Sequence, residues 1–198
     1  AKVELEAGIV KIDASHLSGN SIFLGGRHGS TVTGTANAIM ASCLAKGRTI
    51  LDGAACEPEI SDLCSMLSKM GANIEGIGSH RLEIEGVERL KGCRHHVIPD
   101  RIEAATYALS AGITNGEICI EGAKIDHLGA FANLLHESGM ELSIDDNKDL
   151  KVKVGPGGLK PLEVITLPYP GFPTDLQAQP TAFACLIPGL SIITEKVY

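Results

Sequence analysis

The sequence predicts an α/β fold (α+β) built from a repeated β-α-β-α-β-β unit. One observation is an internal repeat: "KGRTILDGA" at 46–54 resembles "NGEICIEGA" at 115–123, with glycines 69 residues apart. Apolar residues also recur with helical spacing in some segments and alternate with charged residues in others. Finally, glycines follow the predicted helices, where a left-handed residue commonly ends a helix.

Each copy of the unit is expected to begin with the same helix and strand. Helices rich in small and apolar residues are predicted over 34–45 and 100–113. A glycine is expected to end each of them. Ile-rich strands then follow at 48–52 and 117–121.

The second half of each copy is predicted to contain another helix and two strands. The helices are expected over 59–70 and 126–138, each with apolar residues on one face and a glycine after it. The strands "ANIEG" and "RLEIEGV" close the first copy, and "MELSI" and "LKVKV" close the second. Their alternation buries one face of the sheet and leaves the other in water.

Parts of two further copies are predicted at the ends of the chain. "YPGFPTDLQAQPTAFACLIPGLSIITEKVY" at 169–198 contains a helix and a strand, and "AKVELEAGIVKIDAS" at 1–15 resembles a closing strand pair. Because a repeat unit buries its apolar face against its neighbours, we expect an internal fragment, truncated at both ends. Pro99 and the charged pair after it begin a helix, which predicts two domains, 1–98 and 99–198.

Composition argues against several classes of function. The formal net charge of −7 over 198 residues gives no support to a nucleic-acid partner, which would favour a basic surface. No apolar run reaches the roughly 18 residues of a membrane span, and the N-terminus lacks a signal-peptide pattern. We therefore expect a cytoplasmic protein with no membrane association.

The cysteines and histidines predict no disulfide and no metal centre. None of the six cysteines lies in a C-x-x-C pair, and most lie in apolar runs, so buried reduced thiols are expected. The adjacent pair His95–His96 has no further ligands at suitable spacing, which favours solvated or locally bonded side chains.

The stretch "YPGFPTDLQAQPTAFACL" at 169–186 contains a carboxylate with two possible roles. Prolines keep the chain extended before Thr174, whose hydroxyl is expected to cap the following helix. Asp175 would then lie in the first turn, where the helix dipole favours a negative charge. From these residues alone, Asp175 is either a helix stabiliser or an active-site group.

Five motifs together resemble those of the UDP-N-acetylglucosamine 1-carboxyvinyltransferases, a family of enolpyruvyl transferases. They are "EPEI" at 57–60, "VERLKG" at 87–92, "PDRIEA" at 99–104, "FPTDLQAQ" at 172–179 and "IITEKVY" at 192–198. The resemblance covers essentially the whole chain. It implies an inside-out α/β barrel of six units in two domains, with the active site between the domains. This chain would supply the end of the first domain and the start of the second.

The resemblance also implies a reaction and its site residues. The enolpyruvyl group of phosphoenolpyruvate would pass to the 3′-hydroxyl of UDP-N-acetylglucosamine, without a metal or organic cofactor, as the first committed step of peptidoglycan synthesis. Asp175 would be the catalytic base. Substrate would be bound by Asp175, by residues at the start of a helix and by one residue near Tyr198: Gly29, Ser30, Thr31, Val32 and Val197.

Two alternatives stay open beside this interpretation. One is a shikimate-type enolpyruvyl transferase, and the other is a non-catalytic repeat module. The resemblance places the catalytic cysteine loop before Ala1, so the fragment by itself is expected to be inactive. Unpaired strand edges also predict possible self-association.

Overall fold

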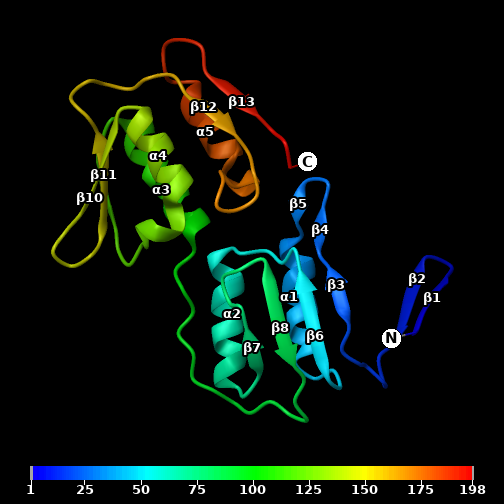
Figure 1. Ribbon diagram of the computed structural model, residues 1–198. Coiled ribbons are helices and arrows are strands. Elements are labelled where there is room, and N and C mark those ends of the chain that lie inside the picture. Colours follow the sequence, from blue (N-terminus) through cyan, green and yellow to red (C-terminus); the bar gives the residue numbers. More distant parts are fainter. Residues whose placement is uncertain (1, 198) are drawn as a thin grey trace. The chain divides into compact units, whose positions relative to one another are not determined.

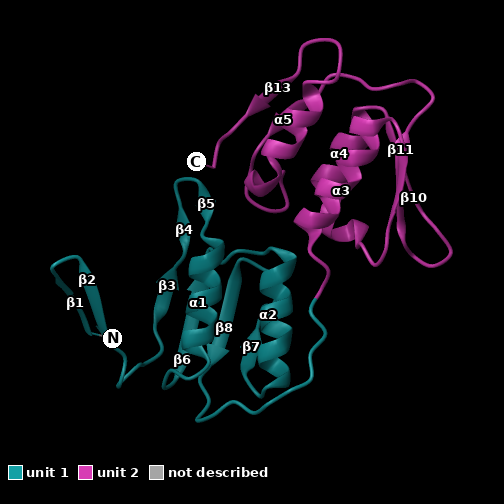
Figure 2. Ribbon diagram, turned by 180° about the vertical axis from the view of Figure 1, so that it is seen from behind, with its two compact units in different colours: residues 1–97 teal, residues 98–198 magenta. Residues whose placement is uncertain are grey.

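The computed structural model describes residues 2–197 of the chain. These residues form two compact units, which divide between Val97 and Ile98 (Figure 2). Each unit has its own hydrophobic core, one in residues 39–84 and the other in residues 104–187.

The first unit contains a four-stranded sheet and two helices (Figure 1). Its elements in chain order are β1 (Lys2–Glu6), β2 (Ile9–Asp13), β3 (Ser21–Phe23), β4 (Gly25–Gly26), β5 (Gly29–Ser30), α1 (Val32–Ser42), β6 (Arg48–Asp52), α2 (Pro58–Lys69), β7 (Asn73–Glu75) and β8 (Arg81–Glu85). The main sheet has the order β3-β6-β8-β7, in which only β3 and β6 are parallel. The pairs β1–β2 and β4–β5 are separate hairpins.

Helices α1 and α2 cover one face of this sheet, because alternation along the strands directs apolar side chains to that face. Leu51 of β6 and Leu82 and Ile84 of β8 are buried there. They share a core cluster with Ile39 of α1 and Ile60 of α2. The opposite face is charged and open to solvent, as the alternating pattern predicts.

The second unit repeats this plan and then begins it again. Its elements are α3 (Arg101–Thr114), β9 (Glu117–Ile120), the 3₁₀ helix η1 (Ile125–Leu128), α4 (Gly129–Glu137), β10 (Met140–Ile144), β11 (Leu150–Val154), β12 (Glu163–Ile165), the 3₁₀ helix η2 (Thr174–Leu176), α5 (Ala178–Ala184) and β13 (Ile192–Thr194). One antiparallel sheet has the order β10-β11-β9, and β12 pairs in parallel with β13.

The core of the second unit packs α3, α4 and α5 against the strands. Leu109 of α3, Leu135 of α4, Val152 of β11 and Phe183 of α5 are almost completely buried in one cluster. The small residues of α3, such as Ala105, allow the neighbouring elements to approach closely.

Glycine ends the predicted helices only in part. Gly71 and Gly139 have φ of 103° and 89° and directly follow the C-caps of α2 and α4, as predicted. The prediction was wrong for α3, because Asn115 has the left-handed conformation there, with φ of 52°. Asn tolerates this conformation better than other residues with a side chain.

The expectation that the thiols are buried was wrong for half of them. Cys43 and Cys64 are buried, but Cys93, Cys119 and Cys185 are exposed. Cys119 is an example of the cause. It lies in β9 between Ile118 and Ile120, so strand alternation turns it to the open face of the sheet. All six cysteines are free thiols.

Candidate functional site

Asp175 lies in the short helix η2, at the end of a Pro-rich turn. Leu176 beside it is completely buried, whereas Asp175 is exposed. Within residues 2–197, the Asp175 carboxylate makes no hydrogen bond or ion pair. The carboxylate is therefore accessible to a molecule in solution, while the neighbouring residue anchors the turn.

Thr174 does not cap a helix, contrary to the sequence-based prediction. The N-cap position of η2 is Pro173, and α5 begins only at Ala178, after the 3₁₀ turn. The Thr174 hydroxyl instead donates a hydrogen bond to Glu195 Oε2, at 3.0 Å. The hydroxyl thus donates to a partner 21 residues away, and the 3₁₀ turn that begins at Thr174 has no side-chain cap.

Glu195 connects three segments of the second unit. Its Oε1 atom accepts hydrogen bonds from the Thr166 hydroxyl at 2.6 Å and from the Val197 N–H at 2.7 Å. Its Oε2 atom accepts the bond from Thr174. The Thr166 hydroxyl also accepts a hydrogen bond from the Lys196 N–H, at 2.9 Å. Glu195 was missed as a candidate, and its only sequence signal is an acidic residue at the end of the Ile-rich strand, two residues before Val197.

Val197 is half-buried, and its backbone direction is fixed by this network. Asp175 and Val197 are therefore held by the same carboxylate, one through Thr174 and the other directly. The structure brings these two sequence-predicted residues into one part of the second unit.

The other predicted binding residues lie in the first unit, at the start of α1. Gly29 and Ser30 form β5, Thr31 is the N-cap of α1, and Val32 is its first residue. Thr31 Oγ1 accepts a hydrogen bond from the Gly34 N–H at 3.3 Å. Gly29 has φ of 108°, which only glycine adopts readily, and this conformation permits the β4–β5 turn.

This segment combines small residues with the N-terminus of a helix. The first N–H groups of a helix lack intrahelical partners, and the helix dipole adds partial positive charge. Such an arrangement is suited to an anion such as a diphosphate.

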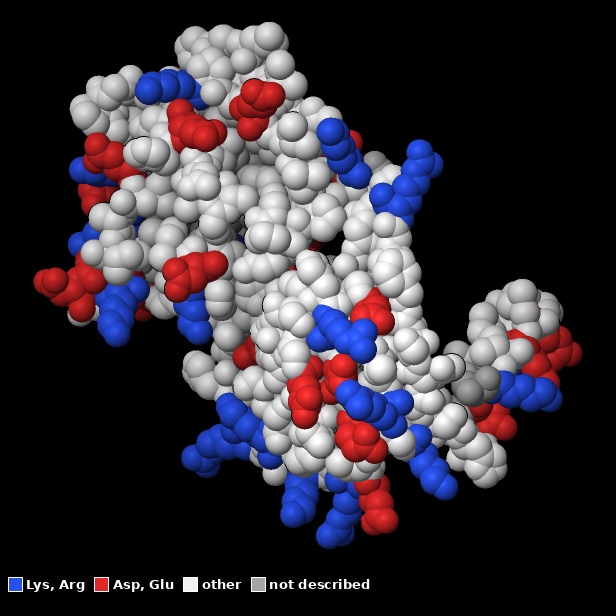
Figure 3. All heavy atoms as spheres, viewed as in Figure 1, with Lys and Arg blue, Asp and Glu red and all other residues white. Residues whose placement is uncertain are grey.

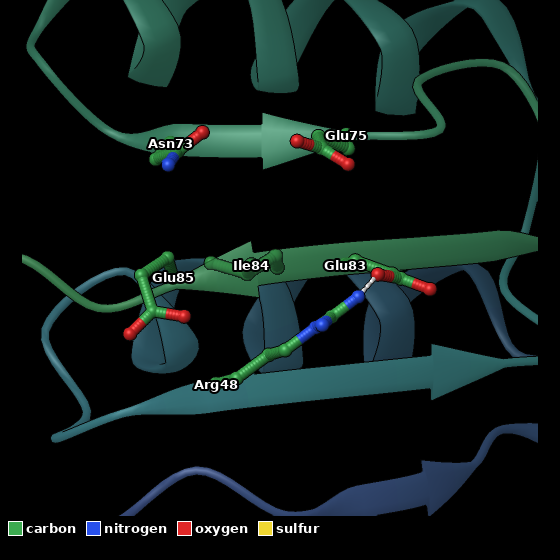
Figure 4. Close-up of a pocket in the computed structure, with 6 residues that line it drawn as sticks. All are labelled: Arg48, Asn73, Glu75, Glu83, Ile84 and Glu85. Atoms are coloured by element: carbon green, nitrogen blue, oxygen red, sulfur yellow. Dashed lines mark ion pairs between the residues drawn. The ribbon is translucent and has the colours of Figure 1, made fainter.

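A shallow pocket of about 250 Å³ lies on the solvent-facing side of the first sheet, and none of the predicted site residues lines it (Figure 4). Arg48 from β6 extends toward Glu83 of β8 and forms an ion pair with it. Glu75 and Glu85 also line the pocket. The excess of carboxylates makes this pocket a poor match for a phosphorylated ligand.

Among residues 2–197, one group of side chains has the spacing of possible metal ligands. Cys119, Asp145 and Asp149 place their ligand atoms within 4.8 Å of one another. Both carboxylates already accept backbone hydrogen bonds, from Asn147, Asp149 and Gly122. Partial desolvation, followed by the two carboxylate charges, raises the pKa of the Cys119 thiol. The thiolate that a metal requires is therefore disfavoured.

The charged surface is mixed. On the face shown in Figure 3, basic and acidic side chains are interspersed over both units. None of the helices in residues 2–197 has both the length and the apolar character required to cross a bilayer.

Comparison with known proteins identifies the family. The sequence profile described as EPSP synthase (3-phosphoshikimate 1-carboxyvinyltransferase) matches residues 1–198. The chain belongs to this family of enolpyruvyl transferases. This match confirms the enolpyruvyl transferase family that the five sequence motifs indicated.

Among the enolpyruvyl transferases, the chain is similar to curated relatives that share one name. The chain is 44% identical to the UDP-N-acetylglucosamine 1-carboxyvinyltransferase of Methylacidiphilum infernorum, over 198 residues. It is 46% identical to the protein of the same name from Gluconacetobacter diazotrophicus, over 199 residues. Each alignment covers 100% of the chain, but only 47% and 46% of the relative. The chain thus spans about half the length of the curated relatives it matches.

Solved structures confirm the predicted α/β enolpyruvyl transferase fold. The enolpyruvyl transferase NikO from Streptomyces tendae aligns with a TM-score of 0.85 and 22% identity, over 100% of the chain and 49% of NikO. EPSP synthase from Acinetobacter baumannii aligns with a TM-score of 0.59 and 17% identity, over 90% of the chain and 40% of that enzyme. At these identities, the likeness concerns the fold alone.

Proposed function

We propose that the chain contributes part of an active site that transfers the enolpyruvyl group of phosphoenolpyruvate to the 3′-hydroxyl of UDP-N-acetylglucosamine. The observation that carries this proposal is identity of 44–46%, over the whole chain, with transferases named for that acceptor. In a bacterium this reaction would serve peptidoglycan synthesis in the cytoplasm.

In this proposal Asp175 is the general base. A sugar hydroxyl is a weak nucleophile, and a carboxylate within hydrogen-bond reach can take its proton as the oxygen attacks. The oxygen would bond to C2 of phosphoenolpyruvate as C3 takes up a proton, which gives a tetrahedral intermediate. Loss of phosphate from C2 and of a proton from C3 would then restore the double bond in the product. The exposure of Asp175 and its lack of a partner within residues 2–197 support this role.

The remaining candidates would hold the acceptor. Gly29, Ser30, Thr31 and Val32 would bind the diphosphate through backbone N–H groups at the start of α1, where anions are favoured. Val197 would contact the sugar through its backbone. The proposal requires no metal or organic cofactor.

Titration of the chain with UDP-N-acetylglucosamine by calorimetry tests the proposal. We expect binding that Asp175→Ala weakens about tenfold or more, a loss of about 1.4 kcal/mol. Asp126→Ala is the matched control, because Asp126 is also an exposed carboxylate in the first turn of a 3₁₀ helix. If both substitutions had the same effect, Asp175 would be only a helix-stabilising charge.

The same titration separates the alternatives. The matching family profile is named after a shikimate-type enzyme. Shikimate 3-phosphate is therefore the second ligand to compare with UDP-N-acetylglucosamine. Preference for that compound would favour the shikimate-type reaction, and failure to bind either compound would favour a non-catalytic module. That the chain alone is inactive stays a prediction, which an assay of phosphate release from phosphoenolpyruvate tests.

A further inference from the structure

The Glu195 carboxylate lies where three segments of the second unit meet. It directly follows β13, whose Thr194 is paired with Ile165 of β12. Thr166, the next residue after β12, is completely buried and donates its N–H to the Thr194 carbonyl. The ends of the two parallel strands are therefore already adjacent before Glu195 makes any contact.

The turn that carries Asp175 starts and returns at the same place. Leu167 donates its N–H to the Phe172 carbonyl at 2.8 Å, which closes the loop between them. Thr166 forms a bridge with Phe172. This closure brings Thr174 next to Glu195.

Glu195 is suited to hold these segments because a carboxylate has enough acceptor sites for all of them. It accepts hydrogen bonds from two hydroxyl groups and from one backbone N–H. Hydrogen bonds to an ionised acceptor are roughly twice as strong as those between neutral groups. None of these three bonds involves the Asp175 carboxylate, which remains open.

We propose that Glu195 is a positioning residue for the Asp175 base: through Thr174 it sets the turn on which Asp175 projects, and through the Val197 N–H it sets the adjoining backbone. This inference rests on the proposed function for its consequence in binding. Its structural part stands on the contacts alone. Glu195 does not touch substrate in this scheme.

Substitutions at Thr174 test the inference without removing the carboxylate. Thr174→Val keeps the shape of the side chain but loses the hydroxyl, whereas Thr174→Ser keeps the hydroxyl. We expect Thr174→Val to weaken binding of UDP-N-acetylglucosamine about fivefold to tenfold, and Thr174→Ser to stay within about twofold of the wild type, as loss and retention of one charge-assisted bond predict. Thr114→Val, at an exposed position near the end of α3, controls for the substitution itself.

A double-substitution cycle shows whether the effect passes through Asp175. With Asp175→Asn already present, Thr174→Val should cause little further loss, because coupled residues are not additive. Full additivity, or wild-type binding by Thr174→Val, would overturn the positioning role.

Hydrogen exchange tests, without any ligand, whether Glu195 stabilises the backbone around it. Glu195→Gln should increase exchange of the Lys196 and Val197 amides relative to those of β11. Suppose that this increase occurred but the wild-type protein bound no nucleotide sugar. The proposed function would then fail, whereas the stabilisation of these segments by the Glu195 hydrogen bonds would be supported. Unchanged exchange of the Lys196 and Val197 amides would show that the Glu195 hydrogen bonds do not stabilise these segments.

Discussion

His95 Nε2 lies 2.9 Å from Asp62 Oδ1, and Lys69 Nζ lies 3.1 Å from His95 Nδ1. Asp62 and Lys69 both belong to α2, whereas His95 belongs to the extended segment after β8. Because a lysine ammonium only donates, Nδ1 accepts a hydrogen bond from Lys69 Nζ, and Nε2–H donates a hydrogen bond to Asp62. The His95 side chain is only 6% exposed. This pair of hydrogen bonds, the His95 relay, attaches the extended segment after β8 to α2.

Loss of the imidazole should destabilise the first unit. We expect His95→Ala to lower the free energy of unfolding by about 1–3 kcal/mol, because the shielded Asp62 carboxylate loses its partner. The matched control is His96→Ala, an exposed position beside it, which should change stability by about 0.5 kcal/mol or less. Urea denaturation followed by circular dichroism measures both. Equal effects would mean that the relay contributes nothing.

The free thiols should differ sharply in reactivity. Burial, followed by the neighbouring Cys43 thiol, raises the pKa of Cys64 to about 11. Since the thiolate is the reactive form, an alkylating reagent at pH 8 should label Cys93 and Cys185 quickly and leave Cys43 and Cys64 unlabelled until urea unfolds the chain. Mass spectrometry of the digested protein reports each site. Labelling of Cys64 as fast as Cys93 in native protein would contradict the buried position.

Local pattern was sufficient for most of the fold. The helix predicted over 100–113 is α3, Arg101–Thr114, and the strand predicted over 48–52 is β6. These elements have strong periodicity and clear end signals, which are properties of adjacent residues. The alternation of apolar and charged residues along the strands likewise predicted a solvent-exposed face of the sheet, which carries Arg48 and Glu83.

The errors arose where a distant residue decides the outcome. Thr174 has the sequence context of a helix cap, but it begins a 3₁₀ turn, and its hydroxyl donates a hydrogen bond to Glu195. Cys119 lies in an apolar run, yet pairing of β9 with β11 at Lys151 leaves it on the open face. The candidate site has the same limitation of local pattern. Its residues were predicted from motif resemblance, whereas the hydrogen bonds of Glu195 to distant segments are seen only in the structure.

The β1–β2 hairpin should exchange its amides much faster than the main sheet. Its apolar face consists of residues that are all 58–75% exposed: Val3, Leu5, Val10 and Ile12. A two-stranded hairpin without further packing is only marginally stable in water. Hydrogen exchange should therefore show little protection in β1 and β2 compared with Leu82 and Ile84 of β8.

The same experiment tests self-association, which stays a prediction. If a second copy covered this apolar face, protection of β1 and β2 would rise with protein concentration. Protection that is low and independent of concentration would exclude this hairpin as the contact. Protection equal to that of β8 at every dilution would contradict its marginal stability.

The β10–β11 hairpin should loosen in acid because of Asp145. Its Oδ1 atom accepts the N–H groups of Asp149 and Asn147, at 3.0 and 2.9 Å. These hydrogen bonds, that from Asp149 first, hold the pKa of Asp145 below its ordinary value of 3.8. A lowered pKa in the folded state means that ionisation of Asp145 stabilises the hairpin above the unfolded pKa, and that this contribution disappears as pH falls through the folded pKa.

Amide chemical shifts followed by NMR from pH 6 downward measure this transition. The Asn147 and Asp149 signals should titrate together, with a midpoint below the ordinary value for an aspartate. Asp145→Asn should remove that transition, since its amide oxygen accepts hydrogen bonds but does not ionise. Asp146→Asn, at the exposed neighbouring position, should leave it unchanged. A midpoint at or above the ordinary value would show that the carboxylate is not held by these amides, and that the turn takes its shape from backbone pairing alone.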